Sequence, residues 1–145
     1  MSSQLNVDTI VDKAGSGGTN VKIGNTSTYV SDGGATTQNT VKGLAKSWIN
    51  ISMNGNSIRD SHNVGSITDN SQGNFSINFS NNMANANYSA SATGGNYSSG
   101  EGNWDHIAHS FNYATNHFRV IGTNNNTDDT VDLPACSVII FGDLA

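Results

Sequence analysis

Two short stretches of the chain alternate apolar and polar residues with a period of two, which is typical of a strand with one buried face. The first, residues 46–53, places its isoleucines on one face and Trp48 at the start of the other. In the second, residues 74–80, Phe and Ile alternate with Asn and Ser. No comparably clear helical spacing follows the first stretch, so we predict that residues 46–145 form a β domain.

Turn signals divide this domain into short strands. Asn54-Gly55 favours a tight hairpin turn, because both residue types tolerate a positive φ. The run Ser137–Phe141 is continuously apolar after its first residue, which predicts a central strand. The expected strands cover residues 46–53, 59–68, 75–79, 88–93, 107–113, 116–123 and 137–141. Short strands separated by turns every 8–12 residues or so predict a mainly β fold, an antiparallel β-sandwich.

Residues 1–45 have a different pattern, with short apolar islets separated by Gly/Ser-rich joints. No islet can bury itself within one chain, and as a free linker the first would be unusually apolar. We therefore predict an extended attachment segment. The residues expected to make its contacts are Leu5, Val7, Ile10 and Val11.

The end of this segment predicts a short helix. Thr36 or Thr37 is a suitable N-cap for a helix that ends near Lys46. Such a short helix is marginal alone, but three copies around an axis would bury its apolar face. The face, which we assign to oligomerisation, consists of Val41, Leu44 and Ala45. The alternative is a single helix packed under the β domain.

The composition supports a thin β protein. Apolar residues are only 34% of the chain, while 22 Asn, 19 Ser, 13 Thr and 16 Gly make up nearly half of it. Disordered chains usually contain more charge and proline than the 12% charged residues and single proline found here. A small core per chain is commonly completed by neighbouring copies, which favours a homo-oligomer.

Charge and hydropathy exclude several partners. The net charge is −5 and the six basic residues are scattered, so no basic stripe for nucleic acid exists. No apolar stretch approaches the roughly 20 residues that span a bilayer, so we expect no membrane insertion. No secretory signal begins the chain, so we expect a protein made in a cytoplasm that does not leave it by a signal peptide.

The residues give little support for enzymatic, metal or cofactor chemistry. His106 and His109 would share a face on a helix, but on a strand they point to opposite sides. Asp128-Asp129 with Asp132 lacks the glycine and closing glutamate of a calcium loop. No Gly-x-Ser-x-Gly elbow is present, and the acidic residues lie mostly in turns. Cys136, the single cysteine, is expected to be a small buried apolar residue. We predict no enzyme, no metal and no cofactor.

Carbohydrate binding has some support from residue type. Sugar sites combine an aromatic platform with amide or carboxylate hydrogen bonding, and such residues gather around the glycine-rich loop at 94–105. The alternative for the indole is that it packs under its own loop. The candidates are Asn96, Tyr97, Asn103, Trp104, Asp105 and Tyr113.

Several segments resemble small fibre-like virion proteins of marine and cyanobacterial tailed phages. The N-terminal similarity is Leu5–Ile10 followed by a Gly/Ser joint. Gly43–Asn50 and Ile58–Val64 are similar to the C-terminal β domain of that family, and Phe141-Gly142-Asp143 to its ending. The resemblance implies a trimeric tail-fibre or head-fibre domain.

The resemblance and the residues together give two hypotheses. In the first, the chain is a non-enzymatic virion fibre protein, made in the host cytoplasm, whose residues 1–45 attach to capsid or tail proteins. Its residues 46–145 then form a trimeric tip that binds host-surface glycans. In the second, the chain is a capsid decoration, cement or head-fibre protein with a mainly structural role.

Overall fold

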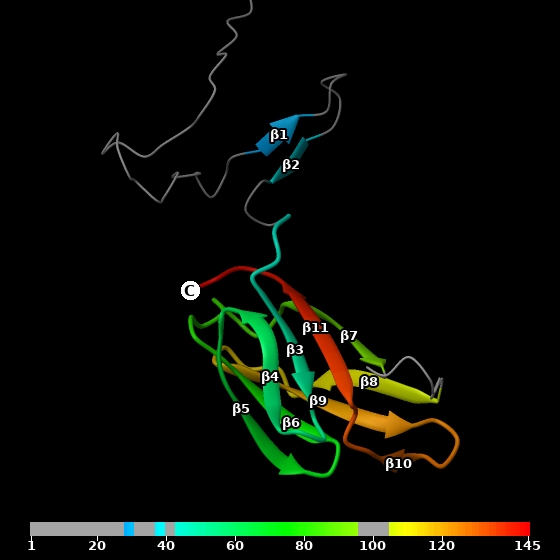
Figure 1. Cartoon of the computed structure of the whole chain (residues 1–145). Helices are drawn as coiled ribbons and strands as arrows, with labels where there is room; N and C mark the ends of the chain where they lie inside the picture. The colour runs from blue at the N-terminus through cyan, green and yellow to red at the C-terminus, as the bar shows by residue number, and fades with distance from the viewer. Residues whose placement is uncertain (1–27, 31–36, 40–42, 96–104) are drawn as a thin grey trace, which may run out of the picture. The chain divides into compact units, whose positions relative to one another are not determined.

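A computed structural model describes residues 28–30, 37–39, 43–95 and 105–145 (Figure 1). The contacts within the chain divide it into two compact units, Met1–Gly43 and Leu44–Ala145. In the first unit, β1 (Thr28–Val30) pairs antiparallel with β2 (Thr37–Asn39), with Thr28 opposite Asn39. The candidate contact residues Leu5, Val7, Ile10 and Val11 lie outside the described residues.

The predicted helix from Thr36 or Thr37 to about Lys46 is wrong for the residues that the structure describes. Thr37–Asn39 is strand β2, and residues 43–46 form a turn and bends. A strand is favoured because the segment finds an antiparallel partner of similar length, and because threonine is β-branched. Of the three residues assigned to oligomerisation, Val41 is not described, Leu44 is 59% exposed and Ala45 is half-buried.

The first sheet of the second unit is antiparallel and has four strands. Its order is β4 (Ser57–His62), β3 (Ser47–Ser52), β11 (Ala135–Phe141) and β7 (Ser89–Gly95). These strands lie side by side in the front layer of Figure 1. The C-terminal strand β11 is central, as its apolar run predicts, with β3 on one edge and β7 on the other.

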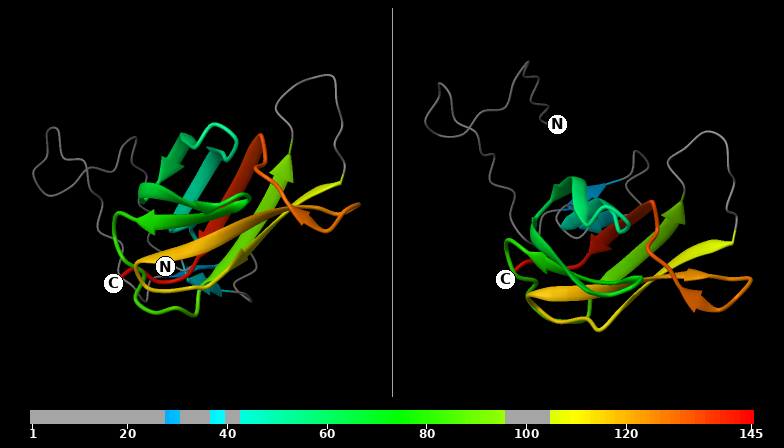
Figure 2. Two further views of the ribbon diagram at one scale, coloured as in Figure 1. Left: turned by 90° about the horizontal axis from the view of Figure 1, so that it is seen from below. Right: turned by 60° about the horizontal axis from the view of Figure 1, so that its bottom comes forward.

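The second sheet is also antiparallel and is organised around β9. The strands are β5 (Val64–Ser71), β6 (Asn74–Phe79), β8 (His106–Phe111), β9 (His117–Asn124) and β10 (Asp129–Thr130). β9 pairs with β6, β8 and the short β10, and β6 pairs with β5. The view from below shows β9 in a different layer from β3 and β11 (Figure 2).

The apolar faces of the two sheets contribute to one core. In β3, Ile49 and Ile51 are buried while Trp48 is exposed, and in β6, Phe75, Ile77 and Phe79 are buried. Cys136 is buried within the same cluster, as expected, and this burial raises the pKa of its thiol to about 12. The prediction of a mainly β fold with antiparallel pairing is therefore confirmed.

The strand predicted over residues 59–68 is in fact two strands that belong to different sheets. Asn63, between β4 and β5, has a φ of 56°, a left-handed conformation that asparagine tolerates better than most residues. Its side chain fixes the bend, because Oδ1 accepts from the Asn81 N–H at 2.7 Å and Nδ2 donates to the Asn81 carbonyl at 3.0 Å. Between residues 57 and 68 the apolar side chains are only Ile58, Val64 and Ile67, which is too sparse a pattern to reveal the change of sheet.

Two glycines allow β6, β9 and β10 to approach closely at one end of the second sheet. Gly73 has a φ of 70°, and its carbonyl accepts from the Gly122 N–H at 2.7 Å. A Cβ added at Gly122 would lie 2.6 Å from both Leu133 Cγ and the Val131 carbonyl oxygen. Gly122 is therefore required for this packing, independently of its backbone freedom.

Candidate functional site

The outer face of the first sheet carries a strip of exposed apolar side chains. Strand β11 alternates, so that Cys136, Val138 and Ile140 are buried, while Ile139 and Phe141 are 38% and 39% exposed. Only alternate residues of the continuous apolar run are therefore buried in the core. The register places Ile139 opposite Trp48 of β3, which is itself 37% exposed.

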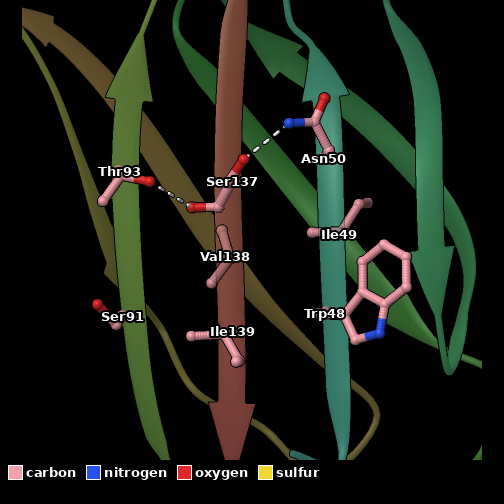
Figure 3. A pocket seen from close by; sticks show the side chains of 8 residues that line it. All are labelled: Trp48, Ile49, Asn50, Ser91, Thr93, Ser137, Val138 and Ile139. Carbon is pink, nitrogen blue, oxygen red and sulfur yellow. Dashed lines mark hydrogen bonds between the residues drawn. The ribbon is translucent and has the colours of Figure 1, made fainter.

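A groove of about 310 Å³ lies on this face and spans β3, β11 and β7. It forms because small side chains stand beside large ones: Ser137 and Ser91 are short neighbours of Trp48 and Ile139 (Figure 3). The side chains of Ile49 and Val138 are buried in the core, so these two residues contribute mainly backbone to it. The lining is Trp48, Ile49, Asn50, Ser91, Thr93, Ser137, Val138 and Ile139.

A row of hydrogen bonds holds the polar half of the groove in place. Asn50 Nδ2 donates to Ser137 Oγ across the two strands at 2.7 Å, and Thr93 Oγ1 contacts the Ser137 carbonyl at 3.5 Å (Figure 3). Because Ser137 Oγ is used as an acceptor, its own proton remains available to a ligand. The groove therefore offers a hydroxyl donor next to an indole ring whose position is set by the sheet.

Arg59 of β4 supports this row from the neighbouring strand. Its guanidinium donates from Nη1 to the Ile51 carbonyl at 3.1 Å and from Nη2 to the Pro134 carbonyl at 2.6 Å. The same Nη1 lies 3.4 Å from Asn50 Oδ1, which orients the amide so that its NH₂ group faces Ser137. Arg59 thus links β4 to the Ile51 and Pro134 carbonyls, although the residue itself is exposed.

Among the described residues that line the groove, none has an acidic or basic side chain. The nearest ionisable groups by register are on β4, where His62 lies opposite Trp48 and Asp60 opposite Asn50. An uncharged lining with one indole, one amide and several hydroxyls matches a neutral ligand that carries many hydroxyl groups. The indole provides a flat apolar surface, and the amide and hydroxyls provide orientation.

The structure does not bring together the two predicted sugar-site residues that it describes. Asp105 immediately precedes β8 and accepts from the Asn126 amide at 2.7 Å, whereas Tyr113 follows the other end of that strand. A six-residue strand is roughly 20 Å long, so closeness in sequence does not give one site. The other four candidates, Asn96, Tyr97, Asn103 and Trp104, lie outside the described residues.

Tyr113 belongs to a packed aromatic pair. Its ring lies edge-on to Tyr88 with centroids 5.1 Å apart, and its hydroxyl is within 2.7 Å of Ser110 Oγ. The Tyr88 hydroxyl is within hydrogen-bond distance of two carbonyls, at 3.1 Å for Ala114 and 3.0 Å for His117. Burial raises the pKa of Tyr88 to about 12, despite the opposing effect of the Ala114 hydrogen bond.

The histidines and aspartates weighed as metal ligands do not gather. His106 and His109 are on one strand at positions of opposite direction, and the Asp132 carboxylate accepts from the Gly73 N–H at 2.6 Å. Asp128 occupies a turn with a φ of 58°. Within the described ranges, no three His, Cys, Asp or Glu side chains form a group that could hold a metal ion.

The groove combines residues that sequence reasoning did not connect. The period-two pattern around Trp48 places its ring on the face opposite Ile49, which the structure confirms. The missing information was the register, since residue 139 lies opposite residue 48 only through a long-range strand pairing. The Ser137–Phe141 run also suggested burial throughout, which hid the exposed side of β11.

Comparisons with known proteins give no relative. No protein-family model matches the sequence, and searches of curated proteins and of solved structures also found no match. Among the described residues, no helix has the length and apolar character required to cross a membrane. The functional argument therefore rests on the chemistry of the groove and on the sequence.

Proposed function

We propose that this protein is a non-enzymatic virion fibre protein of a tailed phage whose C-terminal β-sandwich binds neutral host-surface glycans. The observation that carries the proposal is the groove, whose lining includes both the exposed indole of Trp48 and the Asn50–Ser137 hydrogen-bonded pair. Residues 1–45 attach the chain to capsid or tail proteins, and residues 46–145 form the tip. The sequence resemblance to small fibre-like virion proteins supports the location.

The groove fits a sugar ring better than an apolar or a charged ligand. A pyranose has a C–H face that stacks on an aromatic ring and hydroxyls at its edge that need donors and acceptors. Trp48 supplies the flat surface, and Ser137, Ser91 and Thr93 supply hydroxyl groups on two adjacent strands. A charged ligand would lose hydration without gaining an opposite charge, because the lining is neutral.

A shallow groove gives weak affinity at one site, and a fibre compensates through copy number. Three tips on one axis and many fibres per particle convert a weak contact into lasting attachment, provided that their spacing matches that of the receptor. We therefore propose a homotrimer. Sedimentation equilibrium of the full-length protein tests this, and a strictly monomeric protein at micromolar concentration would contradict it.

The glycan proposal is tested by titrating the full-length, ¹⁵N-labelled protein with neutral mono- and disaccharides. The indole N–H resonance of Trp48, assigned through Trp48→Phe, reports on the groove in the wild type, and the backbone amides of Asn50 and Ser137 report on it in every variant. We expect saturable shifts with at least one saccharide, and at least about tenfold weaker binding for Trp48→Ala. The matched control is Ile58→Ala, since Ile58 has the same 37% exposure on the same sheet but lies outside the groove. If no saccharide shifts the Trp48 resonance, the glycan proposal fails.

The structural alternative is favoured by the exposed apolar side chains of Ile139 and Phe141, which suit contact with another virion protein. Incubating full-length protein with virions that lack it separates the two functions. Binding to capsids together with no saccharide binding would establish decoration. Binding to host cells that a saccharide competes away would establish an adhesin.

A further inference from the structure

The outer face of the second sheet has one basic and no acidic side chain among its described strand positions. Its outward positions follow from the buried ones, because Phe118 and Val120 of β9 point into the core and their neighbours point out. These positions on β5, β6, β8 and β9 are Ser66, Thr68, Asn70, Asn74, Ser76, Asn78, Ile107, His109, Phe111, His117, Arg119, Ile121 and Thr123. None is acidic, in a chain with eleven acidic and six basic residues.

Arg119 lies at the centre of this face. Its strand β9 is flanked by β6 and β8, and the register places Ser76 on one side of Arg119 and Phe111 on the other. The side chain is half-buried, and in the part of the chain that the structure describes its Nε atom is shielded from solvent without a hydrogen-bond partner. A shielded donor left without a partner is destabilising, so the guanidinium favours an acceptor that can engage it.

The neighbours of Arg119 also present donors. Asn70 Nδ2 donates to Ser76 Oγ at 2.9 Å, so the proton of the Ser76 hydroxyl is still available. Asn78 uses its amide in the same way, donating to Ser66 Oγ at 3.1 Å. A guanidinium next to a hydroxyl whose proton is free to donate favours a ligand group that accepts hydrogen bonds.

We propose that this face is a second binding site, specific for an oxyanion such as a sugar carboxylate or sulfate ester, with Arg119 as its central ligand. A small rotation of the guanidinium brings Nε–H and one Nη–H to the two oxygens of the anion, a pairing whose fork geometry suits both oxyanions. Ser76 donates a further hydrogen bond, and Phe111 provides the apolar side of the site. The site is separate from the Trp48 groove, which lies on the other sheet.

Other uses of Arg119 fit less well. A structural role would pair the guanidinium with a carboxylate or with backbone carbonyls, as Arg59 does on the first sheet, and the outward positions around Arg119 offer no carboxylate. Nucleic acid would need several basic residues along one track, whereas Arg119 is the only arginine or lysine on this face.

The test is a titration of the full-length, ¹⁵N-labelled protein with three sugars of similar size: D-glucuronate, D-glucose 6-sulfate and D-glucose. The Nε–Hε resonance of Arg119, assigned through Arg119→Lys, reports on the site in the wild type, and the backbone amides of Ser76 and Phe111, which lie opposite residue 119, report on it in every variant. We expect saturable shifts with glucuronate, glucose 6-sulfate or both, and none with glucose. The two anions distinguish a carboxylate source from a sulfate source.

Three variants complete the experiment. Arg119→Gln is expected to bind the effective anion at least about tenfold more weakly, and Arg119→Lys to retain part of the affinity because the charge stays while the fork is lost. Lys22→Gln removes the same charge from the other unit and is expected to leave binding unchanged. Equal shifts with sodium chloride, no shift with either anion, or unchanged binding by Arg119→Gln would each overturn the proposal. If Arg119→Gln fails to fold, the wild-type titration and Arg119→Lys still decide.

Because the Trp48 and Arg119 resonances are observed in the same spectra, failure of one site is distinguishable from failure of the other.

Discussion

The outer faces of the two sheets share one construction and differ in the residue at the centre. On the first sheet, Asn50 donates to Ser137 across two strands, and on the second, Asn70 donates to Ser76 in the same way. The side chain beside the first pair is the indole of Trp48, and beside the second it is the guanidinium of Arg119. Neutral amides and hydroxyls therefore surround an uncharged aromatic ring on one face and a cation on the other.

The comparison shows how a thin protein can acquire two kinds of surface from few residue types. Asn and Ser fix the geometry on both faces, so ligand preference depends on one side chain per face. The cation of Arg119 favours an anion, while the uncharged groove around Trp48 favours a neutral sugar. The variants below either destabilise the fold that supports both faces or change the proposed binding site on one face alone.

Phe118→Ala is expected to have the largest effect, because it damages both faces through the core. The Phe118 ring is 1% exposed and packs against Phe79 with centroids 5.6 Å apart. We expect its removal to lower the free energy of unfolding by about 3–5 kcal/mol. Urea unfolding measures this, with Ile107→Ala, an exposed residue on the adjacent strand, as the control. A loss below about 1 kcal/mol would show that the two sheets do not depend on a shared core.

Asn63 variants are expected to weaken the fold at the point where the chain leaves the first sheet for the second. Asn63→Gly loses the three side-chain hydrogen bonds with Asn81 but tolerates the positive φ. Asn63→Ala loses the same bonds and is strained as well, by about 1–2 kcal/mol. We therefore expect the free energy of unfolding to be highest for the wild type, lower for Asn63→Gly and lowest for Asn63→Ala. Equal stability of the Gly and Ala variants would mean that the backbone conformation is not what asparagine provides here.

Trp48→Ala and Arg119→Gln are expected to separate the two faces. Each should weaken its own ligand at least about tenfold while changing the affinity of the other ligand by less than about twofold, since distant sites act independently. Parallel titrations with a neutral saccharide and with glucuronate measure all four combinations. A loss of both ligands in either variant, at unchanged stability, would indicate a single shared site.

Tyr88→Phe is expected to have the smallest effect at neutral pH, about 1 kcal/mol, from the lost hydrogen bond to the Ala114 or His117 carbonyl. At alkaline pH the stability that Tyr88 contributes relative to phenylalanine is expected to decrease. The folded protein holds the Tyr88 proton up to about pH 12, whereas an unfolded tyrosine releases it near pH 10. The stabilisation is thus present below pH 10 and lost as the pH rises through 12.

Urea midpoints across that alkaline range measure the contribution of Tyr88. We expect the wild type to lose stability more steeply than Tyr88→Phe, with Tyr29→Phe as the control because Tyr29 lies on β1 in the other unit. Identical slopes for wild type and Tyr88→Phe would show that Tyr88 is not the group that titrates.

The sequence predicts those parts of the fold that depend on local periodicity. β3 and β6 were expected because apolar and polar residues alternate there, and the faces assigned to Ile49 and Trp48 are the observed ones. The helix after Thr36 failed because weak i, i+3, i+4 spacing competes with a nearby partner strand, and pairing is a property of two segments. The single strand predicted over residues 59–68 is wrong because the few apolar residues there give no periodic signal, and one left-handed asparagine ends β4 before β5 begins.

The candidate site was less predictable than the fold. The groove requires Trp48, Ser137 and Ser91 to meet, and these residues come from β3, β11 and β7, far apart in the chain. Aromatic residues near glycine-rich loops drew attention to Asp105 and Tyr113, which lie at opposite ends of β8. The sequence gives the chemistry of each side chain, but which residues share a face across strands depends on long-range register.

The Asn-to-Ser bonds on both faces have a consequence for the medium in which the protein works. They join neutral groups, so the ionic atmosphere, which screens charges beyond about 10 Å at 0.1 M salt and beyond about 3 Å at 1 M, has little effect on them. The groove around Trp48 should keep its shape from fresh water to brine. Only the attraction of Arg119 for an anion should weaken as ionic strength rises, which would make one face indifferent to salinity and the other responsive to it.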